Sequence, residues 1–297
     1  MDADSNLVFG LVSGLGMMIV AAASVILWRR VTRLPFRWFW VGAGLWLVAV
    51  VLKATCAALT NAAVFAYIQQ HLPYILMVVC GGLYSGIQSS LFEIGLTLMA
   101  VVIWRQLGQD AQRAIGIGMG AGAFEAFLLG LGSFIAVGAA VMQVAGADEI
   151  RRQITAAAAT TPLFWLLAPV ERIFAILCHA ASRALVLLGV AKRRSVLIVW
   201  GFLIFTLLDG VAGAAHISGA IGKISLWWIE LAILPFALIS LAILKRCSVY
   251  WWGSNEQSMA TAEDAGSSAA ALGQTPFDRP LSADPGREAR TQKEEER

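Results

Sequence analysis

Residues 163–192 read LFWLLAPVERIFAILCHAASRALVLLGVAK, a stretch in which nearly all side chains are apolar. At a rise of about 1.5 Å per residue, a helix of this length exceeds the hydrocarbon core of a bilayer, which is about 30 Å thick. Within the stretch stand Glu171, Arg172, His179 and Arg183, whose exposure to lipid would be costly. The stretch therefore predicts a membrane-spanning helix that other helices surround.

The composition of the whole chain also indicates a membrane protein. Apolar side chains make up 59% of the residues, charged ones make up 14%, and the mean hydropathy is +0.73. Soluble domains hold roughly 45–50% apolar and about 25% charged residues. Apolar runs long enough to span the hydrocarbon core lie at 7–28, 38–59, 75–104, 114–144, 162–190, 196–217 and 225–244. We therefore expect an all-α, polytopic transmembrane bundle of about seven helices.

Charged residues are distributed unevenly along the chain. Ten acidic and seventeen basic side chains precede residue 253, and nine acidic and five basic ones follow it. The basic residues concentrate in the loops after the first, third, fifth and seventh apolar runs. This pattern predicts that these loops face the cytoplasm of a bacterial inner membrane and that the N-terminus lies outside. The same pattern accounts for the net charge of +3, so we expect membrane lipid and no nucleic acid as a partner.

The chain divides into two parts by composition. Residues 1–252 contain all the apolar runs and would form the transmembrane domain. Residues 253–297 are rich in small, polar and charged side chains and cannot bury enough apolar surface to fold alone. We expect this second part to be a disordered cytoplasmic tail.

Ionisable residues stand at a similar depth in several predicted spans. Glu93, Glu125 and His179 each lie about eleven residues from the cytoplasmic end of their span, which corresponds to ~16 Å at the helical rise. Asp209 lies slightly further out. Carboxylates and an imidazole at one level are suited to bind a divalent metal or to activate a water molecule.

The same buried residues could instead pair with their neighbours and stabilise helix packing. Arg172, His179 and Arg183 recur at spacings of seven and four residues, so they lie along one stripe of the fifth span, which must face inward. Glu171 is rotated by about 100° from Arg172 and could pair with Arg172 or Arg183. A reactive site and a packing network therefore both remain open interpretations.

Glycines recur at every second position from 116 to 122, shortly before Glu125. Spacings of four residues, as between Gly118 and Gly122, let the backbone of a neighbouring helix approach closely. This pattern predicts that Glu125 stands in a tight helix interface.

Four further polar residues are expected near the outer membrane surface. Three lie toward the outer ends of their spans, where a long side chain can reach the polar interface, and one lies in an outer loop. They are Lys53, His216 and Glu230 in the spans and His71 in the loop.

Three segments resemble motifs of the YhfC family of intramembrane metalloproteases, which is related to the CAAX-processing and bacteriocin-immunity proteases. The segment SLFE at 90–93 resembles the glutamate motif of that family, and GMGAGAFEA at 118–126 resembles its glycine-rich motif with a following glutamate. The segment from Glu171 to His179 resembles its third motif. Spacing and predicted topology agree over roughly residues 7–245.

The chain departs from the pattern of this family at three positions. Ile94 stands where a second glutamate is usual, Ala121 where a histidine is expected, and Phe205 where a histidine often precedes the aspartate of the sixth span. The arginine that usually follows the glutamate motif is also absent before Arg105.

The resemblance implies that the chain hydrolyses peptide bonds within the bilayer. Glu93 or Glu125 would activate water, and His179 would hold a metal or stabilise the oxyanion. Zinc would be held by Glu125, His179 and Asp209, with Glu93 as a further ligand. The implied partner is a transmembrane peptide or protein substrate, and a glutamate mechanism without a metal is the alternative chemistry.

Two functions of other classes remain open. The departures favour a catalytically inactive relative that binds a membrane partner and uses Glu171, Arg172 and Arg183 as a scaffold of ion pairs. A small-solute or proton-coupled transporter would also use buried carboxylates. The sequence shows no internal repeat of the kind that is common in transporters, which counts against this function.

Overall fold

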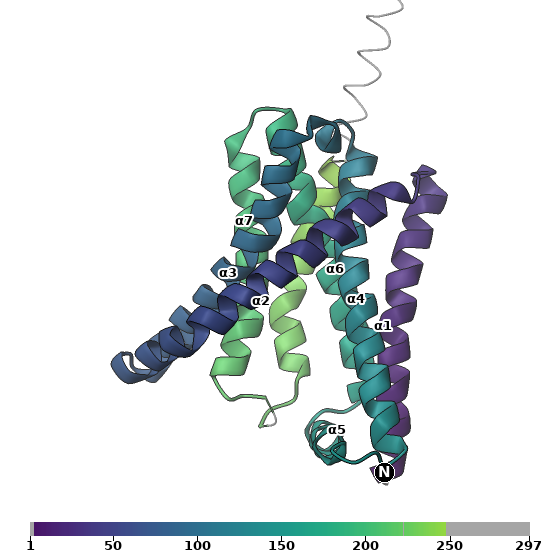
Figure 1. The fold of residues 1–297 in the computed structure, drawn as a ribbon, viewed down its shortest axis with the longest axis vertical. Helices are drawn as coiled ribbons and strands as arrows, with labels where there is room; N and C mark the ends of the chain where they lie inside the picture. The colour runs from purple at the N-terminus through teal and green to yellow at the C-terminus, as the bar shows by residue number, and fades with distance from the viewer. Residues whose placement is uncertain (1–2, 222, 248–297) are drawn as a thin grey trace, which may run out of the picture. The chain divides into compact units, whose positions relative to one another are not determined.

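The structure, a computed structural model, describes residues 3–221 and 223–247, which form a bundle of long helices (Figure 1). Short loops join most of the successive helices. The elements in chain order are α1 (Ala3–Thr32), α2 (Arg37–His71), α3 (Tyr74–Ile103), the short 3₁₀ helix η1 (Arg105–Gly108), α4 (Ala111–Val141), α5 (Asp148–Thr160), α6 (Phe164–Ala191), α7 (Ser195–Ile217) and the last helix (Trp227–Cys247).

Seven of these helices are long and apolar enough to cross a membrane, which confirms the predicted all-α bundle of about seven spans. The two elements that do not qualify are η1 and α5. Across the described parts of the chain, the sole β-type pairing is an isolated bridge between Ile221 and Ile224. The predicted tail, 253–297, lies outside the described residues, and the direction in which the bundle crosses the membrane stays a prediction.

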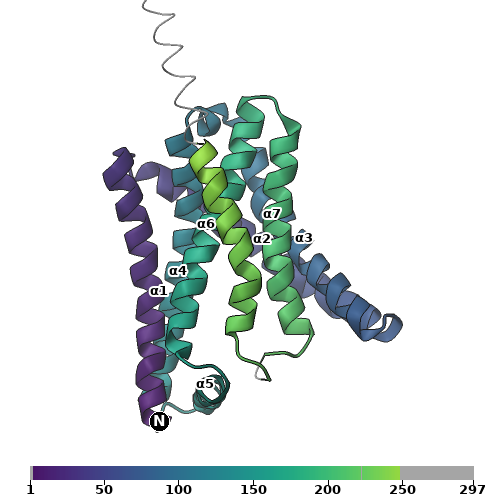
Figure 2. The same cartoon turned by 180° about the vertical axis from the view of Figure 1, so that it is seen from behind.

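Helix α6 contains the charged stretch and is the most buried of the spans. It packs against α1, α3, α4 and α7, and the last helix covers it beside α7 (Figure 2). The predicted inward stripe is confirmed, because Arg172, His179 and Arg183 are all buried. The stripe can be tolerated at the centre because neighbouring helices supply partners for it.

The glycines of α4 permit close contacts with two different helices. An ideal Cβ at Gly118 would lie 2.6 Å from Ala180 Cα of α6, and one at Gly120 would lie 2.2 Å from the Phe39 carbonyl oxygen of α2. A side chain at either position would collide with a backbone. The predicted tight interface is therefore present. In the turns just before Glu125, α4 lies between α2 and α6.

Helix α2 is much longer than its predicted span of 38–59. It continues for 35 residues to His71, which corresponds to about 52 Å at the helical rise, and it crosses the bundle obliquely (Figure 1). The predicted position of His71 in a loop is wrong, because this residue ends the helix and stacks on Tyr67. Polar residues in the last turns ended the apolar run before the helix itself ended.

Helix α5 lies between the fourth and fifth spans and is not among the predicted elements. It lies across the end of the bundle near the start of α1 (Figure 1). Its Ile150 and Ile154 pack against a cluster formed by Leu7 and Val137. Arg151 donates a hydrogen bond to the Ala140 carbonyl oxygen at 2.9 Å, so α5 is attached to both α1 and α4.

Candidate functional site

Glu93 on α3 is held by cations from two other helices. Its Oε1 accepts a hydrogen bond from Lys53 Nζ at 2.7 Å, and its Oε2 accepts one from Arg183 Nη2 at 3.2 Å. Lys53 also donates to Ser89 Oγ at 3.2 Å. Glu93 is only 2% exposed, and a carboxylate so deeply buried needs such partners.

Glu125 on α4 accepts hydrogen bonds from α2 and α6. Arg172 Nη1 donates to Oε1 at 2.7 Å, while Trp46 Nε1 donates to Oε2 at 3.0 Å. His179 Nε2 lies 3.0 Å from the same Oε2. The Glu125 side chain is 20% exposed, so it is far more accessible than the side chain of Glu93.

These groups form one continuous network across α2, α3, α4 and α6. The cations and carboxylates alternate, so three positive charges face three negative ones and the network is neutral when His179 is uncharged. Neutrality is important because a net charge is costly in the interior of a membrane protein. In order of contact the members are Lys53, Glu93, Arg183, His179, Glu125, Arg172 and Glu171.

Arg183 determines which nitrogen of His179 carries the proton. Its Nη1 lies 2.8 Å from His179 Nδ1, and a guanidinium can only donate, so Nδ1 must accept. The proton of the neutral imidazole is therefore on Nε2 and is donated to Glu125. The Phe205 ring lies edge-on to the imidazole at 4.9 Å between centroids and further restricts its orientation.

Glu93, Glu125 and His179 are close enough to share one metal ion by distance alone, because each offers a ligand atom within 4.8 Å of the others. Their hydrogen bonding argues against such a site. The only lone pair of the neutral imidazole faces Arg183, and each carboxylate oxygen already accepts from a cation or an N–H group. A divalent ion would also add two positive charges beside Lys53 and Arg183. With these hydrogen bonds in place, the ligand atoms of the two glutamates and the histidine do not fit a metal ion.

The remaining predicted site residues lie at the edge of the network. Asp209 on α7 lies near Ser89 and within electrostatic range of Lys53, but it is not in the group of described residues whose ligand atoms come together. Glu171 pairs with Arg172, as the packing interpretation of the sequence predicts. Of the three residues predicted to hold zinc, the structure therefore groups Glu125 with His179 and leaves Asp209 outside.

Apolar packing fills the three positions at which the chain departs from the motif pattern. Ile94 and Phe205 are fully buried and pack together with Val186. Ala121 is also fully buried, at the point where Gly42 of α2 approaches α4. Two of the three departures thus form an apolar cluster, and its Phe205 directly contacts the imidazole of the network.

Two contacts that α2 makes in the network, from Lys53 and from Trp46, are not predicted by the sequence. The expectation that Lys53 lies at the membrane interface is wrong: α2 runs to His71, so Lys53 lies near the middle of that helix, where it reaches Glu93. Trp46 stands in an apolar run, and nothing in that run indicates its hydrogen bond to Glu125.

Glu230 and His216, the two other residues predicted to lie near the outer membrane surface, differ in their exposure. Glu230, expected at the interface, is buried one turn into the last helix, and its Oε2 has no hydrogen-bond partner among the described residues. It borders an apolar pocket that Phe174 and Val170 of α6 also line. His216 lies exposed in the last turn of α7, which agrees with an interfacial position.

Seven spans around a buried, ion-paired group of carboxylates and one histidine define a polytopic membrane protein with an ionisable centre. The chain belongs to the YhfC intramembrane metalloprotease family, whose model matches residues 16–233. This range includes every member of the network. No curated protein and no solved structure matches the chain.

Proposed function

We propose that the chain hydrolyses peptide bonds within the membrane by means of a water molecule that Glu125 activates, without a protein-bound metal. The observation that carries this proposal is that the partly exposed Glu125 side chain is hydrogen-bonded to His179 Nε2. A general base must be able to meet water, and a nearby N–H group is needed for the oxyanion that forms. Membership of the family supports the class of reaction.

In the proposed reaction, Glu125 removes a proton from water while the water oxygen attacks the carbonyl carbon of the substrate. The carbonyl oxygen becomes an oxyanion, which accepts the hydrogen bonds of His179 Nε2 and Trp46 Nε1 once Glu125 has taken the proton and no longer holds these groups as a carboxylate. Glu125 then returns the proton to the amide nitrogen. The C–N bond breaks, and one carboxylic acid and one amine leave.

Glu93 has a different role in this proposal. It is 2% exposed and both its oxygens accept from cations, so it has little access to water. Its contact with Arg183 places the guanidinium against His179 Nδ1. Glu93 is therefore a positioning residue that maintains the N–H group of His179 on the side of Glu125.

Binding of a transmembrane segment without cleavage is the second candidate function. The contact of Phe205 with His179 favours it, because the phenylalanine ring and Ile94 put apolar surface where the motif pattern has ionisable groups. In that case the ion pairs of Arg172 with Glu125 and Glu171 would stabilise the bundle only.

Cleavage of a transmembrane reporter peptide by the purified full chain in proteoliposomes distinguishes these functions. The wild type and Glu171→Gln should cut the reporter, because Glu171 lies at the end of the network, whereas Glu125→Gln should not. Thermal unfolding of each variant shows whether it is folded. A folded wild type that retains the reporter but leaves it intact would support binding without cleavage and would exclude the hydrolase.

A further inference from the structure

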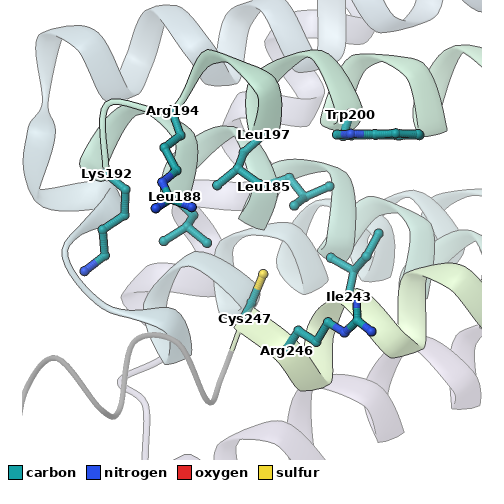
Figure 3. A pocket seen from close by; sticks show the side chains of 9 residues that line it. All are labelled: Leu185, Leu188, Lys192, Arg194, Leu197, Trp200, Ile243, Arg246 and Cys247. Carbon is teal, nitrogen blue, oxygen red and sulfur yellow. The ribbon is translucent and has the colours of Figure 1, made fainter.

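A cavity of about 630 Å³ lies at the C-terminal end of α6, far from the first residue of that helix, Phe164. The loop between α6 and α7 borders one side of it, and the end of the last helix borders the other side (Figure 3). This volume falls within the range of ordinary ligand pockets, about 300–1,000 Å³. None of the residues that line the cavity belongs to the ion-pair network.

Three cations stand around this cavity. Lys192 and Arg194 come from the α6–α7 loop, and Arg246 comes from the last turn of the last helix on the other side (Figure 3). All three are exposed, and none of the salt bridges between described residues includes any of them. Positive charges grouped around one cavity attract an anion into it.

The remaining wall of the cavity is apolar. Leu185 and Leu188 are buried at its floor, and Ile243 lies on the side of the last helix. The Trp200 ring, which is 52% exposed, extends along the wall (Figure 3). A tryptophan beside cations is typical of the membrane interface. A small inorganic anion would leave this apolar wall unused, whereas an anion with a hydrocarbon chain would cover it.

We propose that this cavity binds an anionic phospholipid, with the phosphate among Lys192, Arg194 and Arg246 and an acyl chain along Leu188 and Trp200. Each basic residue near an anionic lipid surface contributes about one kcal/mol of attraction. The site is independent of the proposed hydrolysis, since none of its residues contacts Glu125. It assigns the basic end of the bundle a specific lipid partner rather than lipid in general.

Native mass spectrometry of the purified full chain in detergent tests the site, with phosphatidylglycerol and phosphatidylcholine of the same chain length as probes. The wild type should bind phosphatidylglycerol more tightly. The triple variant Lys192→Gln/Arg194→Gln/Arg246→Gln should bind it roughly 10–100-fold more weakly. The control variant Arg30→Gln/Arg105→Gln/Arg193→Gln, which removes three exposed charges that do not line the cavity, should bind it like the wild type.

A variant whose cavity is filled by a larger side chain distinguishes binding of the lipid inside the cavity from attraction of the lipid to surface charge. Leu197→Trp keeps all three cations but adds a large ring to the lining, and it should weaken phosphatidylglycerol binding by a similar factor. Equal affinity of the wild type for both lipids would overturn the proposal. So would equal weakening by the two triple variants, or full binding by Leu197→Trp, because the lipid would then be attracted by surface charge alone.

Discussion

Arg183 Nη1 lies 2.8 Å from His179 Nδ1, and both side chains are buried in the centre of the bundle. This contact joins the two glutamates, because Arg183 also pairs with Glu93 and His179 also contacts Glu125. One guanidinium thus sets the tautomer of the imidazole and the order of charges around it. Most of the chemistry proposed for this chain depends on that arrangement.

Removal of Arg183 should destabilise the bundle strongly. Arg183→Met leaves Glu93 buried with one cation instead of two, and breaking a buried ion pair costs about 3–5 kcal/mol. Denaturant unfolding in detergent micelles measures this loss. The double variant Glu93→Met/Arg183→Met should recover at least half of it, and the exposed control Arg30→Met should unfold like the wild type. A double variant less stable than Arg183→Met would contradict the pairing.

Removal of Arg183 should increase the amount of zinc that the protein binds, although it lowers the stability of the bundle. In the wild type, Arg183 occupies the lone pair of the imidazole, so dialysed protein should retain far less than one zinc per chain. Arg183→Ala removes that donor and a positive charge, and leaves Glu93, Glu125 and His179 within reach of one ion. This variant should therefore retain more zinc than the wild type, as measured by atomic emission. A wild type with one tightly held zinc would show that the network rearranges.

Close packing of α2 on α4 should depend on one glycine and not on its neighbour. An ideal Cβ at Gly42 would lie 1.8 Å from the Ile117 carbonyl oxygen, whereas one at Gly44 would have nothing within 4 Å. Gly42→Ala should lower the free energy of unfolding by about 1–3 kcal/mol through overpacking. Gly44→Ala should change it by less than about 0.5 kcal/mol. Similar effects of the two alanines would mean that α2 does not approach α4 as described.

Phe205 should contribute to stability through the cluster beside His179. Phe205→Ala empties a fully buried site, and such truncations cost about 3–5 kcal/mol. Phe127→Ala, at a position of α4 that is 42% exposed, is the matched control and should cost far less. Thermal unfolding of both variants in one detergent tests this. Equal stability of the two would place Phe205 outside the core.

The spans and the inward stripe could be predicted from the sequence because both are local patterns. The apolar runs match six helices to within a few residues at most ends, and the spacing of Arg172, His179 and Arg183 requires a common face. The depth count brought Glu93, Glu125 and His179 to one level, and the structure places them together. Each of these predictions needs only the helical rise and repeat.

The partners of these residues could not be predicted, because they depend on the tilt and the true length of each helix. Lys53 reaches Glu93 only because α2 extends past the apolar run and crosses the bundle obliquely. Trp46 and Phe205 stand in apolar runs, in which a tryptophan or phenylalanine carries no sign of the polar group that it contacts. Asp209 lay near the predicted depth, yet depth alone does not fix the face on which a residue lies.

The rate of reporter cleavage by the wild type after treatment with a chelator, measured beside Glu125→Gln, tests the central claim most directly. The proposed mechanism uses the Glu125 carboxylate and no metal, so the chelated wild type should cut at its full rate. Glu125→Gln should be slower by at least about 100-fold, as is usual for loss of a general base. Cleavage that stops with the chelator and returns with zinc would contradict the account, and so would undiminished cleavage by Glu125→Gln.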